Sequence, residues 1–444
     1  MSAKYIGRRG FLALTGGTVA ALTLSACFSD ESNSTPKNIG KKFDMTAKQT
    51  IEVWDFDATG IDAWVEADTK FDAYFKEKYP NVTVNKTKAG FTGFAEALLT
   101  SVAGGKKYDV IYGWAPWLPQ FKDNRVVDPL TGYLESDPVV NADSFYDYGK
   151  DVLDGEVYGL GWYASAEFMY YNKPAIQAAG APDPGELDAA GKWDYDAMQS
   201  LAETVSTVGS KPVFGFDMGV TRGTGDYGAF AKARGTDLWN DDFTGSTLDS
   251  KENVELWKWI QNFYKNKWTP LPSQGSGLAE SVGFGDQRIL MFISGANYFR
   301  QAAQQKVNES FEIGLARIPK GSGGQSAVTY VNSYFMGSRG ENLGAGWEWY
   351  KERTFSDHAR ELYAATGASR FPVRKDQDPV TVYPFEDAEL FKQISEDMYK
   401  VPVVNNQAKI DEAFGTAWDK MVLGESVEQV LKDLTSTANG LVKA

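Results

Sequence analysis

Few side chains in this chain could carry covalent catalysis or bind a transition metal. The 444 residues include one histidine, His358, and one cysteine, Cys27. Zinc sites need several Cys and His ligands, and Ser-His-Asp or Cys-His catalysis needs a histidine beside the nucleophile. His358 lies in a charged, helix-like stretch and is expected to be solvated. The glycine-rich stretch 321–324 lacks the Gly-Lys-Ser/Thr ending of a P-loop. The composition therefore predicts no metal site and no cofactor.

Carboxylates leave one class of enzyme open. Glycosidases use two carboxyl groups about 5 to 9.5 Å apart, and 59 Asp and Glu residues cannot exclude such a pair. A secreted glycoside-cleaving enzyme therefore stays an alternative. Asp241 and Asp242 lie beside Gly245 but lack the spacing of an EF-hand loop, so this stretch is interpreted as a hairpin turn.

Aromatic side chains are the chemistry that is abundant: 13 Trp, 22 Tyr and 26 Phe. The C–H faces of pyranose rings pack on indole and phenol rings, and a pocket with a few placed polar groups completes such recognition. Aromatic residues also dominate hydrophobic cores, so most of these should be structural. Helical spacing predicts a core role for at least one residue of the pair Trp257 and Trp259 and of the pair Trp347 and Trp349, and an amphipathic helix predicts the same for Trp418.

The elements that would position ligand-binding aromatics alternate between strand and helix. Strands are predicted at 50–56, 82–87 and 108–112, separated by helices at 61–78 and 94–103. This alternation indicates an α/β domain of βαβ units with a parallel sheet, where ligands bind at the carboxyl ends of strands. The side chains near these ends are candidates for ligand binding: Trp54, Asp55, Trp114 and Trp117.

The stretch 157–175 is a long run of extended-favouring aromatics that begins after the turn at Asp154-Gly155. Such an apolar run between Gly and Pro predicts a buried strand. It is too long for one lobe, so we expect it to leave one domain, cross a cleft and enter a second. Three residues at the crossing are ligand-binding candidates: Tyr163, Ser165 and Glu167.

This crossing motif, Gly155-x-x-Tyr-Gly-Leu followed by Tyr170-Tyr-Asn-Lys, resembles the extracellular solute-binding proteins of family 1. These are receptors of ABC importers, largely for oligosaccharides. The similarity continues through 108–130, 284–299, 330–337 and 368–374. It implies an α/β fold of two Rossmann-like lobes joined by a hinge of several crossings. By this resemblance the further ligand-binding candidates are Asn297, Tyr298, Asn332, Ser333 and Arg370, with the hairpin residue Trp239 as an additional candidate.

The N-terminus predicts export. Arg8-Arg9 precedes a short apolar run, which is typical of a signal peptide of the twin-arginine type. Leu24-Ser-Ala-Cys27 resembles a bacterial lipobox, so Cys27 is the predicted site of lipidation. The expected organisation is a lipoprotein signal peptide at 1–26, a lipidated flexible tether at 27–47, an N-terminal lobe of 48–166 plus 337–374, and a C-terminal lobe of 167–336 plus 375–444.

These features together predict a lipid-anchored receptor that captures an oligosaccharide by hinge closure and delivers it to the transmembrane subunits of an ABC permease. We expect a monomer on the outer face of the cytoplasmic membrane, from a Gram-positive bacterium, held to the membrane by the lipid anchor only. The net charge of −14 argues against nucleic acid binding. It also keeps open a polyamine or other cationic ligand for the same fold, through cation–π contacts and carboxylates.

Overall fold

The structure is a computed structural model of the chain. It describes residues 43–59, 62–91, 93–137, 139–272, 283–295, 310–359, 371–376, 388–400 and 402–443. The chain divides into two compact units, 1–37 and 38–444, and all described residues belong to the second. The predicted signal peptide, Cys27, Asn297, Tyr298 and Arg370 lie outside the described residues.

The first part of the fold is a sheet in the order β2-β1-β3-β9-β6-β5. β1 (Gln49–Phe56) pairs in parallel with β2 (Val82–Ala89) and β3 (Val110–Trp114), and α1 (Asp62–Lys78) and α2 (Phe94–Ala103) make the connections. β9 (Ala327–Gly337) is antiparallel to β3, and β6 (Glu156–Asn172) is antiparallel to β9. The sheet is therefore mixed rather than wholly parallel, because these two strands arrive from distant parts of the chain.

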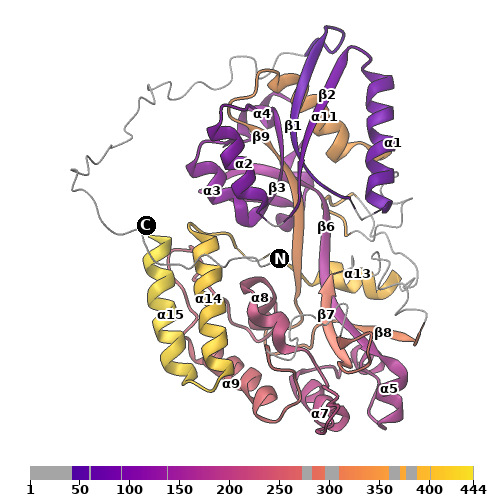
Figure 1. Ribbon diagram of the computed structural model, residues 1–444, viewed down its shortest axis with the longest axis vertical. Helices are drawn as coiled ribbons and strands as arrows, with labels where there is room; N and C mark the ends of the chain where they lie inside the picture. Colours follow the sequence, from indigo (N-terminus) through magenta and orange to yellow (C-terminus); the bar gives the residue numbers. More distant parts are fainter. Residues whose placement is uncertain are drawn as a thin grey trace, which may run out of the picture. The chain divides into compact units, whose positions relative to one another are not determined.

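β6 confirms the long strand predicted within 157–175; it ends at Asn172, where α5 (Lys173–Ala178) begins. Its first half pairs with β5 (Lys150–Leu153) and β9, and its second half pairs with β7 (Met291–Gly295) and β8 (Ile313–Ala316). Figure 1 shows β6 and β9 running between the first lobe, which contains β1, β2, β3 and β5, and the second lobe, which contains β7 and β8. These two crossing strands are the structural connection on which the site depends.

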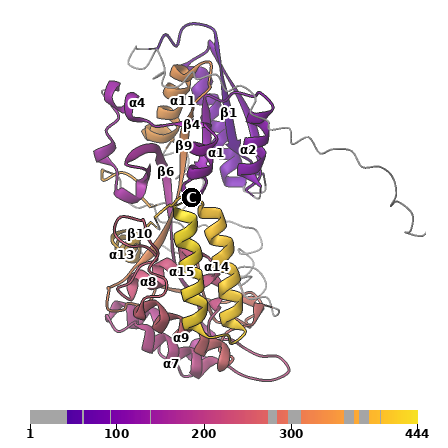
Figure 2. The ribbon, with the colours of Figure 1, turned by 90° about the vertical axis from the view of Figure 1, so that its left-hand side faces the viewer.

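Helices complete both lobes. α11 (Leu343–Phe355) packs on the first lobe, and the second lobe contains α7 (Tyr195–Val205), α8 (Thr224–Ala233) and α9 (Lys251–Lys265). The C-terminal helices α14 (Gln407–Val422) and α15 (Val427–Val442) lie side by side (Figure 2). Shorter elements are η1 (Ala115–Trp117), α3 (Leu118–Asp123), β4 (Val127–Asp128), α4 (Thr131–Ser136), η2 (Ala142–Ser144), η3 (Asp147–Gly149), α5 (Lys173–Ala178), α6 (Pro184–Ala189), η4 (Met218–Arg222), α13 (Ala388–Glu396) and β10 (Met398–Tyr399). No helix in the described part of the chain is long and apolar enough to span a membrane.

The tryptophans of the helices are buried, whereas residues 213–218 do not form a continuous strand. Both members of each tryptophan pair, and Trp418, pack inside the two hydrophobic clusters: Trp257, Trp259, Trp347, Trp349 and Trp418. The extended stretch 213–218 forms only isolated bridges, at Val213 and Phe214. Its extension ends because the Asp217 carboxylate accepts the Gly219 N–H and caps η4.

Candidate ligand-binding site

Strand register places several of the predicted ligand-binding residues on one face of the crossing strands. Trp114 of β3 lies opposite Asn332 of β9, and Asn332 lies opposite Tyr163 of β6. Ser165 lies opposite Tyr330. Directly opposed residues share a face, as do residues two apart in a strand. The positions Trp114, Ser165, Glu167, Tyr330 and Asn332 therefore form one surface, here called the ligand face.

Aromatic rings cluster where β2 and β3 end at this face. The Phe91 ring centroid lies 5.4 Å from that of Trp114 and 5.2 Å from that of Trp117, and Trp114 lies 5.9 Å from Tyr330. Phe91 is 50% exposed, and Trp114 and Trp117 are partly exposed. Trp117 is held from behind by the buried Phe94, with ring centroids 4.7 Å apart and planes 12° apart. The cluster Phe91, Trp114, Trp117 and Tyr330, here called the aromatic platform, offers rigid apolar rings.

A pocket of about 280 Å³ adjoins the platform and has a polar wall on the second lobe. Thr224 donates its hydroxyl to Oδ1 of Asp411 at 2.6 Å, and the Gln407 amide donates to the same oxygen at 3.0 Å. Among the described residues, the other carboxylate oxygen of Asp411 accepts no hydrogen bond. Burial raises the pKa of Asp411, and the two donors oppose that shift. The pocket therefore offers a fixed acceptor to a ligand hydroxyl.

Tyr330 connects the platform to further carboxylates. Its hydroxyl donates to Oδ1 of Asp226 at 3.1 Å. Burial raises the pKa of Tyr330 well above its usual value, and the nearby charges of Asp226, Glu167 and Asp411 raise it further. Tyr330 consequently stays neutral and keeps its donor at physiological pH.

Other predicted residues lie away from this pocket. Trp54 and Asp55 are 4% and 3% exposed, because β1 continues to Phe56 and keeps both residues inside the strand. Trp54 packs edge-on against Phe94 and Tyr108. Asp55 accepts the Tyr334 hydroxyl at 3.2 Å and lies 4.0 Å from the Lys86 ammonium. These two residues therefore belong to the core of the first lobe.

Trp239, Ser333 and Asn332 also have structural surroundings. Trp239 is 4% exposed in the core of the second lobe, where the predicted hairpin is represented by its bridge to Ser246. Ser333 is fully buried on the face opposite to the ligand face. Asn332 accepts the Tyr112 hydroxyl, which orients its amide. Of the crossing candidates, Ser165 is buried and Glu167 is partly exposed.

Five residues of the site were not among the predicted ones: Phe91, Thr224, Tyr330, Gln407 and Asp411. Phe91 follows β2, so the rule that favoured residues after β3 would also have selected it. Tyr330 lies two residues before Asn332 in a strand and shares its face by alternation. Thr224, Gln407 and Asp411 lie near the starts of two helices far apart in sequence, and no local pattern brings them together.

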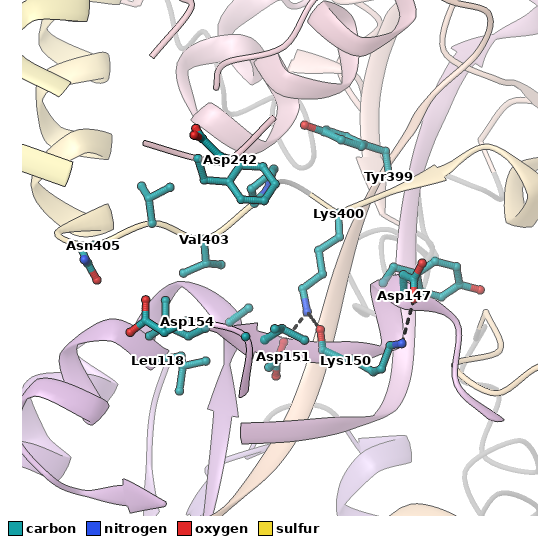
Figure 3. A pocket seen from close by; sticks show the side chains of 18 of the residues that line it. Leu118, Asp147, Lys150, Asp151, Asp154, Asp242, Tyr399, Lys400, Val403 and Asn405 are labelled. Atoms are coloured by element: carbon teal, nitrogen blue, oxygen red, sulfur yellow. Dashed lines mark hydrogen bonds and ion pairs between the residues drawn. The ribbon is translucent and has the colours of Figure 1, made fainter. Parts of the chain in front are cut away.

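A larger cavity, of about 1060 Å³, shares Ala115, Lys400, Pro402 and Val403 with the first pocket and extends along the other face of the crossing strands. Its lining includes Asp151 of β5 and Lys400, which follows β10 (Figure 3). A Cβ on Gly159 would lie 2.6 Å from the Phe335 ring and 3.0 Å from Oδ2 of Asp151, so these side chains share a face. Phe335 alternates with Tyr334 and is therefore on the face opposite to Asn332. None of the described residues that line this opposite-face cavity is among the ligand-binding residues predicted from sequence.

Metal coordination has no support in the described residues, where no group of three or more His, Cys, Asp or Glu side chains could hold an ion. The candidate site consists of rings, hydroxyls, an amide and carboxylates. These groups suit reversible binding of a polar organic ligand.

The sequence assigns the family of this chain. The chain matches the bacterial extracellular solute-binding proteins over residues 70–392 and belongs to that family. A binding protein of Brucella abortus is 25% identical over 377 residues, covering 83% of this chain and 88% of that one.

Solved structures share the two-lobed fold. The ABC substrate-binding protein Lmo0181 of Listeria monocytogenes, in complex with cycloalternan, has a TM-score of 0.74 at 22% identity, covering 88% of this chain and 98% of that one. The GacH receptor of Streptomyces glaucescens, solved unliganded and with acarbose, has a TM-score of 0.71 at 17% identity, covering 89% and 98%. These similarities confirm the predicted α/β two-lobed architecture.

Proposed function

We propose that this protein is the extracellular receptor of an ABC importer and that it binds an oligosaccharide on the ligand face. The observation that carries the proposal is the aromatic platform beside the fixed acceptor of Asp411. A pyranose needs both an apolar ring surface for its C–H face and oriented acceptors for its hydroxyls. The pocket supplies the two within one lining, from two lobes.

The proposed mechanism is closure of the two lobes on the sugar. Phe91, Trp114 and Trp117 come from the first lobe. Thr224, Gln407 and Asp411 come from the second lobe, on whose core Tyr330 of the crossing strand β9 also packs. A sugar that contacts both lobes gains its full interaction energy only when they approach. Ligand binding then shifts the population toward the closed form by the difference in affinity for the two states. We also propose the lobe boundaries expected from sequence, with 48–166 plus 337–374 in the N-terminal lobe and 167–336 plus 375–444 in the C-terminal lobe.

Similar proteins support the ligand class. The Listeria protein was solved with cycloalternan, and a maltose/maltodextrin-binding protein of Bdellovibrio bacteriovorus was solved bound to maltotriose. Both ligands are oligosaccharides, so the same class is proposed here. The family consists of binding proteins, and we propose that no bond of the ligand is made or broken.

The cellular part of the proposal rests on the N-terminus. Export by the twin-arginine route, removal of residues 1–26 and lipidation of Cys27 would hold the receptor at the outer face of the cytoplasmic membrane of a Gram-positive bacterium. There it would meet the transmembrane subunits of its permease as a monomer. Replacing Cys27 by Ser should release the protein into the medium; retention in the membrane fraction would refute lipid anchoring.

A cationic ligand is the second candidate, favoured by one observation. The charges of Asp226, Glu167 and Asp411 all act on the Tyr330 hydroxyl, so three carboxylates gather beside the aromatic platform. Such a lining would also suit an ammonium group.

Isothermal titration calorimetry separates the two candidates. The protein is titrated with maltotriose, mannotriose and cycloalternan, and separately with spermidine at two salt concentrations. We expect micromolar or tighter binding of at least one sugar, with little dependence on salt. Binding of spermidine alone, weakening as salt rises, would replace the oligosaccharide with the cationic ligand.

A further inference from the structure

Lys400 joins the two lobes on the face opposite to the ligand face. Its ammonium donates to the Lys150 carbonyl at 2.9 Å and forms an ion pair with Oδ1 of Asp151 (Figure 3). The Asp151 side chain is fully buried and that of Lys400 is 16% exposed. Because both charges are largely removed from water, this contact is stronger than an ordinary surface ion pair.

The two partners are fixed to different lobes. Asp151 belongs to β5, which pairs with the first half of β6. Lys400 directly follows β10, whose residues Met398 and Tyr399 pair with the start of β9.

Contacts of the residues just before Lys400 hold its segment to the second lobe. The Tyr399 hydroxyl donates to Asp237 at 2.8 Å, and the guanidinium of Arg317, just after β8, donates to Asp397 at 3.2 Å. The ion pair therefore spans from one lobe to the other, beside the cavity of about 1060 Å³.

We infer that the Lys400–Asp151 ion pair is a latch that opposes lobe closure and thereby sets ligand affinity from the face opposite to the ligand. The inference rests on the proposed function, because it assumes that closure accompanies binding. The crossing strands β6 and β9 lie between the ligand face and the latch. A rotation about these strands that brings the lobes together at the ligand face moves them apart at the opposite face. Closure therefore lengthens the ion pair.

The consequence for affinity follows from populations. If the binding-competent closed state is a minor one, apparent affinity is reduced in proportion to its population. Weakening a contact that exists only in the less closed state raises that population. Loss of the latch should tighten sugar binding roughly fivefold, the change expected from about 1 kcal/mol. Lys400 also lines the ligand pocket, but its ammonium is held by Asp151 and the Lys150 carbonyl, and Asp151 does not line that pocket.

The test compares two lysines that line the same cavity. Lys400→Met removes the latch charge and keeps the aliphatic stem. Lys150→Met removes the matched charge of an ion pair within the first lobe, where Lys150 and Asp147 lie 2.8 Å apart (Figure 3). Because Lys400→Met leaves the buried Asp151 carboxylate without its counter-charge, the double variant Lys400→Met/Asp151→Asn is measured beside it.

Two measurements are made on each protein. Calorimetry with maltotriose should give a lower Kd for both latch variants and an unchanged Kd for Lys150→Met. Small-angle X-ray scattering without ligand should give a smaller radius of gyration for the double variant than for the parent. Equal or weaker maltotriose binding by a folded double variant would overturn the latch. If maltotriose binds to none of the proteins, the proposed sugar ligand loses support, but scattering still tests the latch. Identical ligand-free scattering profiles of the parent and the double variant would overturn the latch.

Discussion

Phe91 offers the sharpest test of whether the ligand stacks on the aromatic platform. Its ring is 50% exposed beside Trp114 and Trp117, in contact distance of both. An aromatic side chain carries roughly 200 Å² of surface, so about 100 Å² is open to a ligand. A sugar that covers one face of the ring would bury about 60 to 80 Å² there, worth about 1.5 to 2 kcal/mol at roughly 25 cal/mol per Å². Phe91→Ala should therefore raise the Kd about 10- to 30-fold.

Phe243 provides the matched control. It is 45% exposed and lines the opposite-face cavity of about 1060 Å³. Phe243→Ala removes the same group from a similarly exposed position, and it should leave the Kd unchanged. Calorimetry with the tightest-binding sugar gives both values, and thermal unfolding shows whether each variant retains its fold. The reverse pattern, with affinity lost in Phe243→Ala and kept in Phe91→Ala, would place the ligand in the other cavity and refute the reasoning.

Three further predictions address the polar groups of the site and the core. Asp411→Asn should weaken sugar binding only about 3- to 10-fold, because a hydroxyl can accept as well as donate and only the charge assistance is lost; a far larger, salt-sensitive loss in calorimetry would indicate a cationic ligand. Arg353→Met should lower the free energy of unfolding by about 3 to 5 kcal/mol, because it leaves the Asp68 carboxylate, 3.0 Å away, buried without its counter-charge; the exposed Lys70→Met should cost less than about 0.5 kcal/mol in the same denaturant titration, and equal costs would contradict the account. Burial raises the pKa of Asp55, so its ionisation disfavours the folded state once the pH exceeds the unfolded value. Asp55→Asn should therefore raise the melting temperature at pH 7, with a smaller gain near pH 4; a lower melting temperature at pH 7 would contradict this.

The order of the elements could be predicted from sequence because each carries its own periodic signal. The helix over 94–103 and the long crossing strand follow from local patterns, and alternation along that strand selects Ser165 and Glu167 for one face. The ends of the strands can be predicted less accurately from sequence than the presence of the strands. β1 ends at Phe56 as predicted, whereas β2 extends past the predicted end at 87 to Ala89 and β3 lies at Val110–Trp114 instead of 108–112. The ladder of β1 with β2 runs to Phe56 and Ala89 and keeps Trp54 inside the strand and in the core. Local propensity does not contain that information.

The polar wall of the site depends on tertiary structure alone. Asp411 meets Thr224 across 187 residues of sequence, and the contact exists because α8 and α14 pack in the same lobe. Neither helix start has a motif that points to a ligand. The ion pair of the latch also depends on tertiary structure, since Lys400 and Asp151 are 249 residues apart in the sequence. Sequence patterns identify which residues form one helix or strand. They do not identify which residues of different elements come into contact, because that depends on how the chain packs.

The most direct test of the central claim is a crystal structure of the protein with the oligosaccharide that binds most tightly in calorimetry. The account predicts density for a sugar ring stacked on the aromatic platform at Phe91, Trp114 and Tyr330, with a hydroxyl within hydrogen-bond distance of Asp411. Density in the cavity beside Lys400 and Phe243, with the platform empty, would contradict it.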